Sequence, residues 1–149
     1  MEKIICFNTK YGWINIIEIN NQVTSVLFGK IGEKNPSSQL KKFKKNILNY
    51  FSGKKIIFND SLQIIGSKLQ KKILNEIKKI PYGETRSYGH IAKLTNTSPR
   101  YVGNVCGQNK HLLIIPCHRV VRSDGSLGGF SGLGGIKLKK NLIDLENNV

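Results

Sequence analysis

Long hydrophobic runs are missing from this sequence of 149 residues. No apolar stretch approaches the roughly 20 residues that a membrane-spanning helix requires. The opening Met1–Lys10 also lacks a basic tip followed by a long apolar stretch, the pattern of a secretion signal. We therefore expect a cytoplasmic protein without membrane contact. Hydrophobic residues still make up 39% of the chain, enough to bury the core of one compact domain or of two small lobes.

Cysteine is also scarce, and its spacing argues against two common uses of this residue. The chain holds three cysteines, an odd number, at wide spacings and without a CxxC pair, and its three histidines do not complete a zinc pattern. We therefore expect neither a disulfide framework nor a structural metal, and at least one free thiol remains to be explained. The residues concerned are Cys6, Cys106, Cys117, His90, His111 and His118.

Acidic residues are few as well. Nine Asp and Glu stand against 24 Lys and Arg, which leaves a formal net charge of +15 at pH 7. A positive field of this size attracts a polyanion and speeds the encounter with it, so the charge favours nucleic acid as a partner. A second interpretation stays open, because the chain is rich in Lys, Asn and Ile. A basic surface can reflect that bias in composition without any binding function.

The first part of the chain has the pattern of strands followed by a helix. β-Branched and aromatic residues predict strands at 4–7, 13–19 and 23–28, and Asn20-Asn21 between the last two suits the tight turn of a hairpin. Residues 36–38 (Pro-Ser-Ser) then open a helix that ends before Gly53, and a short strand is expected at 56–58. The apolar face of that helix consists of Leu40, Phe43, Ile47 and Phe51.

Helical patterns dominate the rest of the chain. Ser67 and Gln70 match a capping box, and isoleucines at helical spacing follow until Pro81. Further helices are expected at 87–95, at 99–107, where Ser98 precedes a proline, and at 136–146. The pair 87–95 and 99–107, joined by a short turn, resembles a helix-turn-helix, although such helix pairs are common in proteins of other functions.

Cys117 beside His118 is the most informative chemical feature. A thiol is a strong nucleophile only as the thiolate, so it needs a base or a positive charge nearby. Neighbours on an extended strand point to opposite faces, so a turn after Pro116 or a bridging water must connect the two side chains. A carboxylate orients a histidine base best, and Glu146 is one candidate. The alternatives are a buried structural cysteine and a histidine whose hydrogen bonds are met within the fold.

The longer sequence around these residues resembles a known family. IPCHRVV at 115–121, with PYGETRSYGHIA at 81–92 and SLGGFSG at 126–132, is similar to the O6-alkylguanine-DNA alkyltransferases. The resemblance is detailed over 69–146 and general over the first lobe. It implies an α+β fold in which a small N-terminal α/β lobe, 1–62, has an antiparallel, ribonuclease-H-like sheet. The second domain, 63–149, is implied to be mainly helical, to bind DNA through a helix-turn-helix and to hold the alkyl acceptor.

The resemblance also implies the reaction. Proteins of this family flip an alkylated guanine out of double-stranded DNA and move its O6-alkyl group, once and irreversibly, to a cysteine of their own. O4-alkylthymine is a further candidate substrate. No cofactor is implied, and we expect a monomer that binds duplex DNA containing alkylated bases.

Family roles carry over to individual positions. The acceptor falls on Cys117, and His118 is implied to deprotonate it through a water while Glu146 holds the histidine and Asn109 supports the turn. The pocket for the flipped base is implied to include Tyr88, Val120, Ser131 and Lys139, with Lys137 as an alternative to Lys139. Arg100 is implied to enter the base stack. The other expected DNA contacts are Ser87, Thr97, Ser98, Tyr101, Asn104 and Arg119.

Two departures and three alternative functions accompany this interpretation. Phe130 stands where many members have tyrosine, and Lys110 follows Asn109 where proline is usual. The first alternative is a lesion-binding protein without chemistry, which carries tryptophan at the acceptor position, so Cys117 argues against it. A thiol hydrolase that uses Cys117, His118 and Glu146, and a helix-turn-helix regulator, are the others.

Overall fold

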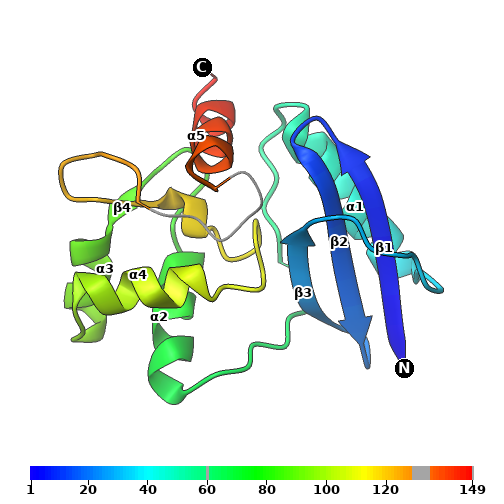
Figure 1. The fold of residues 1–149 in the computed structure, drawn as a ribbon, viewed down its shortest axis with the longest axis horizontal. Helices are drawn as coiled ribbons and strands as arrows, with labels where there is room; N and C mark the ends of the chain where they lie inside the picture. The colour runs from blue at the N-terminus through cyan, green and yellow to red at the C-terminus, as the bar shows by residue number, and fades with distance from the viewer. Residues whose placement is uncertain (60, 129–134, 149) are drawn as a thin grey trace. The chain divides into compact units, whose positions relative to one another are not determined.

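The computed structural model describes residues 1–59, 61–128 and 135–148. They form a mixed fold of helices and strands in two compact units (Figure 1). The first unit consists of 1–64 together with 110–114, and the second of 65–109 together with 115–149. No helix in the described part of the chain is long and apolar enough to cross a membrane.

A three-stranded antiparallel sheet forms the centre of the first unit. Its strands β1 (Glu2–Thr9), β2 (Gly12–Ile19) and β3 (Gln22–Phe28) lie in the order β1-β2-β3, which confirms the three early strands expected from the sequence. Asn20 and Asn21 join β2 to β3 with φ angles of 53° and 64°. Two successive left-handed residues are what a two-residue hairpin turn requires, so the prediction of a tight turn is confirmed.

Helix α1 (Ser38–Phe51) packs against β1. The Ser37 side chain caps its first turn by accepting a hydrogen bond from the backbone N of Leu40 at 3.1 Å. The helix therefore begins where the Pro-Ser-Ser sequence predicted it. Its buried residues follow the expected spacing: Leu40, Phe43, Ile47, Tyr50 and Phe51.

The strand expected at 56–58 is wrong. These residues have no strand pairing, and the ring of Phe58 instead lies 5.7 Å, centre to centre, from the rings of both Phe43 and Tyr50. Ile57 between them is exposed. The short apolar run of this segment thus reflects the packing of Phe58 onto α1, which needs no backbone partner.

A distant stretch of the chain completes the first unit. Val26 of β3 donates its backbone N–H to the Lys110 carbonyl at 2.7 Å and accepts from the Leu112 N–H at 3.0 Å. Leu112, Leu113 and Ile114 are all buried. The open edge of β3 is therefore paired by residues that follow it by more than eighty positions in sequence, a contact that no local pattern predicts.

The described part of the second unit contains four α-helices: α2 (Lys68–Lys78), α3 (Tyr88–Thr95), α4 (Pro99–Gly107) and α5 (Gly135–Glu146). The predicted capping box of α2 is present, with both reciprocal hydrogen bonds between Ser67 and Gln70. Ser87 caps α3 and Ser98 caps α4, each by accepting a backbone N–H. Asn96, in the left-handed conformation at φ 56°, ends α3 and begins the turn into α4.

Two short elements near Cys117 were not predicted. Strand β4 (Arg86–Ser87) pairs in parallel with β5 (Val120–Val121). A single 3-10 turn, η1 (Cys117–Arg119), directly precedes β5. Because β4 leads into α3 and β5 follows η1, this pairing fixes the start of α3 next to the segment that contains Cys117.

Candidate active site

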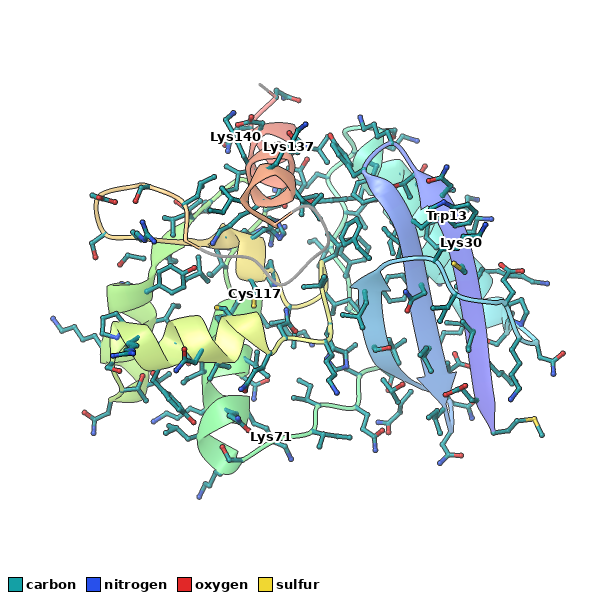
Figure 2. All side chains as sticks on the ribbon, viewed as in Figure 1. Trp13, Lys30, Lys71, Cys117, Lys137 and Lys140 are labelled. Carbon is teal, nitrogen blue, oxygen red and sulfur yellow. The ribbon has the colours of Figure 1, made fainter. Side chains whose placement is uncertain are left out.

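Cys117 lies at the first position of η1, and 2% of its surface is exposed (Figure 2). Its backbone N donates to the Ile115 carbonyl at 2.8 Å, and Arg119 N donates to the Pro116 carbonyl at 2.9 Å. The chain therefore turns tightly at Pro116 rather than continuing as a strand. The sequence left two possible connections between Cys117 and His118, a turn after Pro116 or a bridging water, and the turn is present.

Asn109 supports this turn from the end of α4. Its side-chain Nδ2 donates to the Ile115 carbonyl at 2.9 Å and to the Cys117 sulfur at 3.2 Å. Its backbone N donates to the Cys106 carbonyl at 3.2 Å. Asn109 thus connects the last turn of α4, through its backbone N, with the Ile115 carbonyl and the Cys117 thiol, through its side-chain amide.

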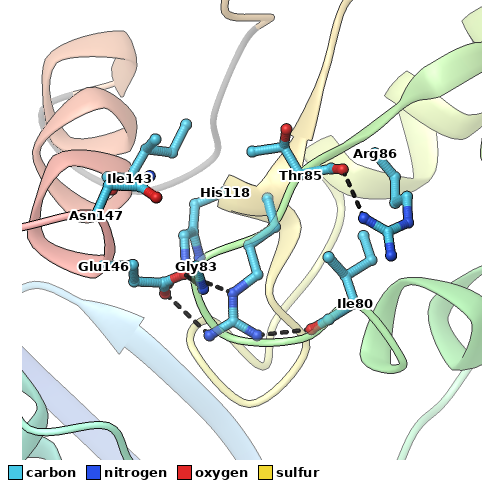
Figure 3. A network of polar contacts seen from close by, with 9 residues as sticks. Ile80, Gly83, Thr85, Arg86, His118, Ile143, Glu146 and Asn147 are labelled. Atoms are coloured by element: carbon cyan, nitrogen blue, oxygen red, sulfur yellow. Dashed lines mark hydrogen bonds and ion pairs between the residues drawn. The ribbon is translucent and has the colours of Figure 1, made fainter.

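Glu146, at the end of α5, is the centre of a buried polar network (Figure 3). Its Oε2 lies 2.6 Å from His118 Nε2 and 2.9 Å from a terminal nitrogen of Arg119, while its Oε1 accepts from Arg119 Nε at 2.8 Å. The backbone N of Gly83 donates to the same Oε1 at 3.1 Å, and Arg119 also donates to the Ile80 carbonyl at 2.8 Å. Residues from the segment between α2 and β4, from η1 and from α5 thereby meet at the Glu146 carboxylate.

The electrostatics of the network set the protonation states. Burial raises the pKa of Glu146, but the hydrogen bonds from His118 and Arg119 prevail and hold it well below its ordinary value. Burial lowers the pKa of His118, against the opposing effect of its hydrogen bond to Glu146. At neutral pH the carboxylate is therefore ionised and the imidazole neutral. An ionised carboxylate only accepts, so the ring proton is on Nε2 and the lone pair on Nδ1.

Tyr88 and Lys139 form a second polar pair. Lys139 Nζ donates to the Tyr88 hydroxyl at 3.0 Å and lies 5.3 Å from the centre of its ring. Lys139 is fully buried, whereas Lys137 is exposed, so Lys139 is the lysine that reaches the tyrosine. Burial is the main cause that raises the pKa of Tyr88 to about 12, and burial lowers the pKa of Lys139. Gly128 packs against the Tyr88 side chain, since a Cβ there would collide with the Tyr88 hydroxyl.

A second thiol adjoins the first. Cys106, on the last turn of α4, is 5% exposed and is the main group that influences the pKa of Cys117. The interaction with Cys106 and burial raise the pKa of Cys117 well above its ordinary value, while the Asn109 hydrogen bond and the charge of Lys139 oppose the rise. At rest Cys117 is therefore a neutral thiol that needs a base before it can attack.

Comparison with known proteins gives the family. Residues 68–148 match the family model for the DNA binding domain of 6-O-methylguanine DNA methyltransferase. The chain is 35% identical over 142 residues to the methylated-DNA–protein-cysteine methyltransferase of Sulfolobus acidocaldarius, covering 94% of this chain and 90% of the relative. It is 34% identical over 147 residues to that of Metallosphaera sedula, covering 96% and 92%. The chain belongs to the methylated-DNA–protein-cysteine methyltransferase family.

Solved structures of family members share the fold. The O6-methylguanine methyltransferase of Mycobacterium tuberculosis superimposes with a TM-score of 0.86 at 28% identity, covering 99% of this chain and 94% of that one. A Mycobacterium tuberculosis structure in complex with DNA gives 0.86 at 29% identity, over 97% and 92% of the two chains. The Methanococcus jannaschii O6-methylguanine DNA methyltransferase gives 0.70 at 34% identity, covering 95% and 92%.

The residues expected to contact DNA divide into three groups. Arg100 and Asn104 are exposed on α4, and Tyr101 between them is partly exposed. Ser87 and Ser98 serve as helix caps, while the Thr97 hydroxyl lies 2.9 Å from that of Thr95. Arg119 forms the third group.

Arg119 does not fit the expected DNA contact. Its side chain is 9% exposed, and its guanidinium donates to Glu146 and to the Ile80 carbonyl. A guanidinium held by these hydrogen bonds inside the fold is not available to a phosphate, so we do not propose it as a DNA contact. Nothing in the sequence around Arg119 indicates that its side chain is buried, so its contact with Glu146 was not predicted.

Two expected pocket residues remain. Val120 is fully buried in β5, while Ser131 lies outside the described residues, as does Phe130. The site residues that the sequence did not single out are Cys106 and Gly128. A cysteine among the apolar positions of a helix and a glycine in a glycine-rich loop each have a common structural explanation, so neither stands out before the site is seen.

Proposed function

We propose that this protein repairs DNA by moving the alkyl group of O6-alkylguanine to the sulfur of Cys117, once per molecule. Membership of the family supports the reaction class. The observation that carries the assignment is the buried Cys117 thiol, which Asn109 contacts at 3.2 Å in the same unit as the Glu146–His118 pair. A buried nucleophile, a neutral histidine and an ionised carboxylate are the parts that a thiol activated by a histidine requires.

His118 acts as the base in this mechanism. Its Nε2–H is held by Glu146, so Nδ1 accepts a proton, and a water transfers that proton from the Cys117 thiol. The resulting thiolate attacks the alkyl carbon on guanine O6. The sulfur–carbon bond forms as the carbon–oxygen bond breaks, and the electron pair of that bond stays with guanine. The product is a thioether, which no group of the site can hydrolyse, so each molecule reacts once.

Tyr88 is the proton donor to the leaving guanine. Its raised pKa, about 12, keeps the phenol protonated at neutral pH. Because Lys139 already donates to the tyrosine oxygen, the phenolic hydrogen is directed to another acceptor. The nearby ammonium also stabilises negative charge that develops on the phenol oxygen as it gives up its proton.

Helices α3 and α4 form a helix-turn-helix in this proposal, with Asn96, Thr97 and Ser98 as the turn between them. Arg100, exposed in the first turn of α4, enters the base stack while the damaged base leaves it. The partner is duplex DNA with alkylated bases, O4-alkylthymine being a further candidate lesion, and the protein acts as a monomer. The first unit is the ribonuclease-H-like lobe. A cytoplasmic location stays a prediction.

The test is a stoichiometric transfer experiment. The protein is incubated with excess duplex DNA that carries labelled O6-methylguanine, and its mass is measured before and after digestion into peptides. We expect one methyl group per molecule, on Cys117. The variant Cys117→Ala is expected to accept none while still binding the DNA, and Cys6→Ala, a matched change outside the site, is expected to accept one. Label on Cys6 or Cys106, or more than one methyl released per molecule as with a thiol hydrolase, would contradict the proposal.

A further inference from the structure

Helix α1, which packs against β1 (Figure 1), has three exposed lysines on its solvent side: Lys41, Lys42 and Lys45. We call these three residues the lysine face. Because Lys45 is four residues from Lys41 and three from Lys42, their side chains are neighbours on the helix surface. Lys44 does not belong to the lysine face, since it is half-buried and its Nζ lies 5.4 Å from the centre of the Phe7 ring.

The lysine face has no acidic partner on its own helix, because the sequence of α1 contains neither Asp nor Glu. Helices of the second unit differ in this respect: Glu76 of α2 pairs with Lys79, and Asp144 of α5 pairs with Lys140. No ion pair in the described part of the chain involves the lysine face. Like charges four residues apart on a helix repel each other, so an anion from outside the protein would stabilise this surface.

Two carboxylates of the first unit bind other groups. Glu18 is 2% exposed, and its Oε2 accepts a hydrogen bond from the Ser37 hydroxyl at 3.0 Å. Glu33 Oε1 accepts one from the backbone N of Cys6 at 3.3 Å. Each carboxylate therefore has a partner within the fold that does not belong to the lysine face.

A polar hollow of about 410 Å³ adjoins the lysine face. The residues that line it are Ser38, Gln39, Lys42, Asn46 and Asn59. Each of these side chains can donate a hydrogen bond, and none carries a negative charge. Phosphate oxygens accept such hydrogen bonds, and the Lys42 ammonium adds a charge of the opposite sign. Hydroxyl, amide and ammonium groups suit a phosphate better than the acyl chains of a lipid.

We propose that the lysine face and the polar hollow bind the phosphates of DNA, as a second contact with the nucleic acid besides that of α3 and α4. The inference rests on the proposed function in taking DNA as the partner. Lys41 and Lys45 are about 6 Å apart along the helix axis. Phosphates of one DNA strand follow each other at about 3.4 Å along the duplex, so the flexible lysine side chains can reach successive phosphates.

The consequence concerns the search for a damaged base. Contacts between lysine and phosphate add affinity without reading the sequence, and they allow a protein to slide and hop along DNA. A second contact of this kind keeps the protein on DNA when α3 and α4 release one base pair to test the next.

The first test maps the contact by lysine protection. The protein is acetylated briefly with N-hydroxysuccinimidyl acetate, with and without undamaged duplex DNA, and peptide mass spectrometry measures the modification of each lysine. We expect DNA to slow the acetylation of the lysine face severalfold and to leave that of Lys30 unchanged. Lys30 is exposed, but its Nζ lies 4.8 Å from the centre of the Trp13 ring, outside α1 (Figure 2).

Three outcomes of this test would overturn the proposal. The first is an unprotected lysine face, and the second is equal protection of Lys30, which would mean that the general positive field alone attracts DNA. The third is protection of the lysine face by vesicles of anionic phospholipid but not by DNA, because the partner would then be a membrane surface.

The second test removes the charges of the lysine face. In a variant with Lys41→Gln, Lys42→Gln and Lys45→Gln, helix α1 should persist, since glutamine is a good helix former and the repulsion is relieved. Fluorescence anisotropy with undamaged duplex DNA measures affinity against salt concentration. We expect the slope of log affinity against log salt to become shallower by about 2–3, and the affinity at low salt to fall about ten- to a hundredfold.

The matched control removes three other exposed lysines of the first unit. Two of them lie near the opposite end of α1 and one on the Trp13 ring; the changes are Lys10→Gln, Lys55→Gln and Lys30→Gln. The net charge falls by the same amount, so an effect of the general field would be equal in both variants. We expect the slope to change by less than about 1 in the control. Equal losses in the two variants would contradict the proposal.

The inference and the proposed function are tested separately. Both binding tests use undamaged DNA, so they do not depend on methyl transfer to Cys117. A protein that fails to transfer a methyl group while DNA still protects the lysine face would refute only the proposed function. Methyl transfer from duplex DNA with an unprotected lysine face would refute only the inference.

Discussion

At the scale of single residues, Glu146 is the buried charge around which the polar network of the described site is built. Its side chain is 2% exposed, and it accepts hydrogen bonds from His118, Arg119 and the Gly83 backbone. Removing a carboxylate from water costs several kcal/mol, which is recovered only when good donors surround it. Here the donors include a full positive charge, so Glu146 and Arg119 depend on each other.

Replacement of this carboxylate should be strongly destabilising. In Glu146→Gln the Arg119 charge stays buried without its counter-charge, so we expect the free energy of unfolding to fall by about 3–5 kcal/mol. Urea unfolding followed by circular dichroism measures the change. Asp144→Asn is the matched control on the same helix, because Asp144 forms an exposed pair with Lys140, and such pairs contribute about 1 kcal/mol or less. Equal losses in the two variants would contradict a special role for Glu146.

The same network predicts how stability depends on pH. The pKa of His118 is lowered from 6.5, so unfolding takes up a proton once the pH falls below about that value. The pKa of Glu146 is lowered from 4.5, so its contribution is complete above that pH and is lost progressively on further acidification. The free energy of unfolding should therefore decline from about pH 6.5 downward. The decline below pH 4.5 should be shallower in Glu146→Gln, and parallel curves would argue against this account.

The sequence pointed to Cys117 and His118 as candidate site residues more clearly than to the residues that surround them. Cys117 and His118 stand in a distinctive local sequence, whereas the influence of Cys106 on the pKa of Cys117 depends on the packing of α4, which local sequence does not record. The choice between Lys137 and Lys139 depends on which face of α5 is buried. The spacing to Glu146 favoured Lys139, and Lys139 is the one of the two that lies on the buried face.

At the scale of elements, α3 and α4 present the surface that we propose for DNA. Arg100→Ala removes the side chain proposed to fill the space of the flipped base, and unstacking a base costs a few kcal/mol. Methyl transfer from duplex DNA should slow about ten- to a hundredfold, while transfer from free O6-alkylguanine should keep its rate, since no base must be flipped. Single-turnover kinetics with both substrates measure this.

The variant Arg100→Lys provides the control for charge. It keeps the positive charge but lacks the planar guanidinium, so it should recover phosphate attraction but only part of the duplex rate. Equal losses of Arg100→Ala on the duplex and on the free base would remove the flipping role.

Elements with local start signals were predicted well. Ser37, Ser67 and Ser98 each cap a helix where the sequence indicated one. A cap can be predicted because all the residues that form it lie within four consecutive positions. The pairing of β4 with β5 was missed, since two-residue strands have no periodicity to detect. The strand at 56–58 was wrong for a different reason: a short apolar run indicates burial, and a single packed ring such as Phe58 accounts for it without a paired strand.

At the scale of the whole molecule, the net charge of +15 predicts binding to DNA that depends strongly on salt. Each phosphate neutralised by Lys or Arg adds about 0.9 to the negative slope of log affinity against log salt concentration. Fluorescence anisotropy with undamaged duplex DNA at several salt concentrations measures that slope. Methyl transfer from free O6-alkylguanine, an uncharged base, serves as the control and should be nearly independent of salt. A flat slope would mean that the lysine-rich surface reflects composition alone.

The order of synthesis has a consequence for the unit that holds the sheet. Ser61 and Gln63 pair with Val23 of β3, but Val26 completes its backbone hydrogen bonds only with Lys110 and Leu112, so this part of the sheet edge stays open until the ribosome has added these residues. By that stage α2, α3 and α4 have already been made. The N-terminal sheet, although synthesised first, therefore finishes folding late. A nascent chain stopped before residue 110 would leave the edge of β3 unpaired at Val26 and open there to pairing with other chains.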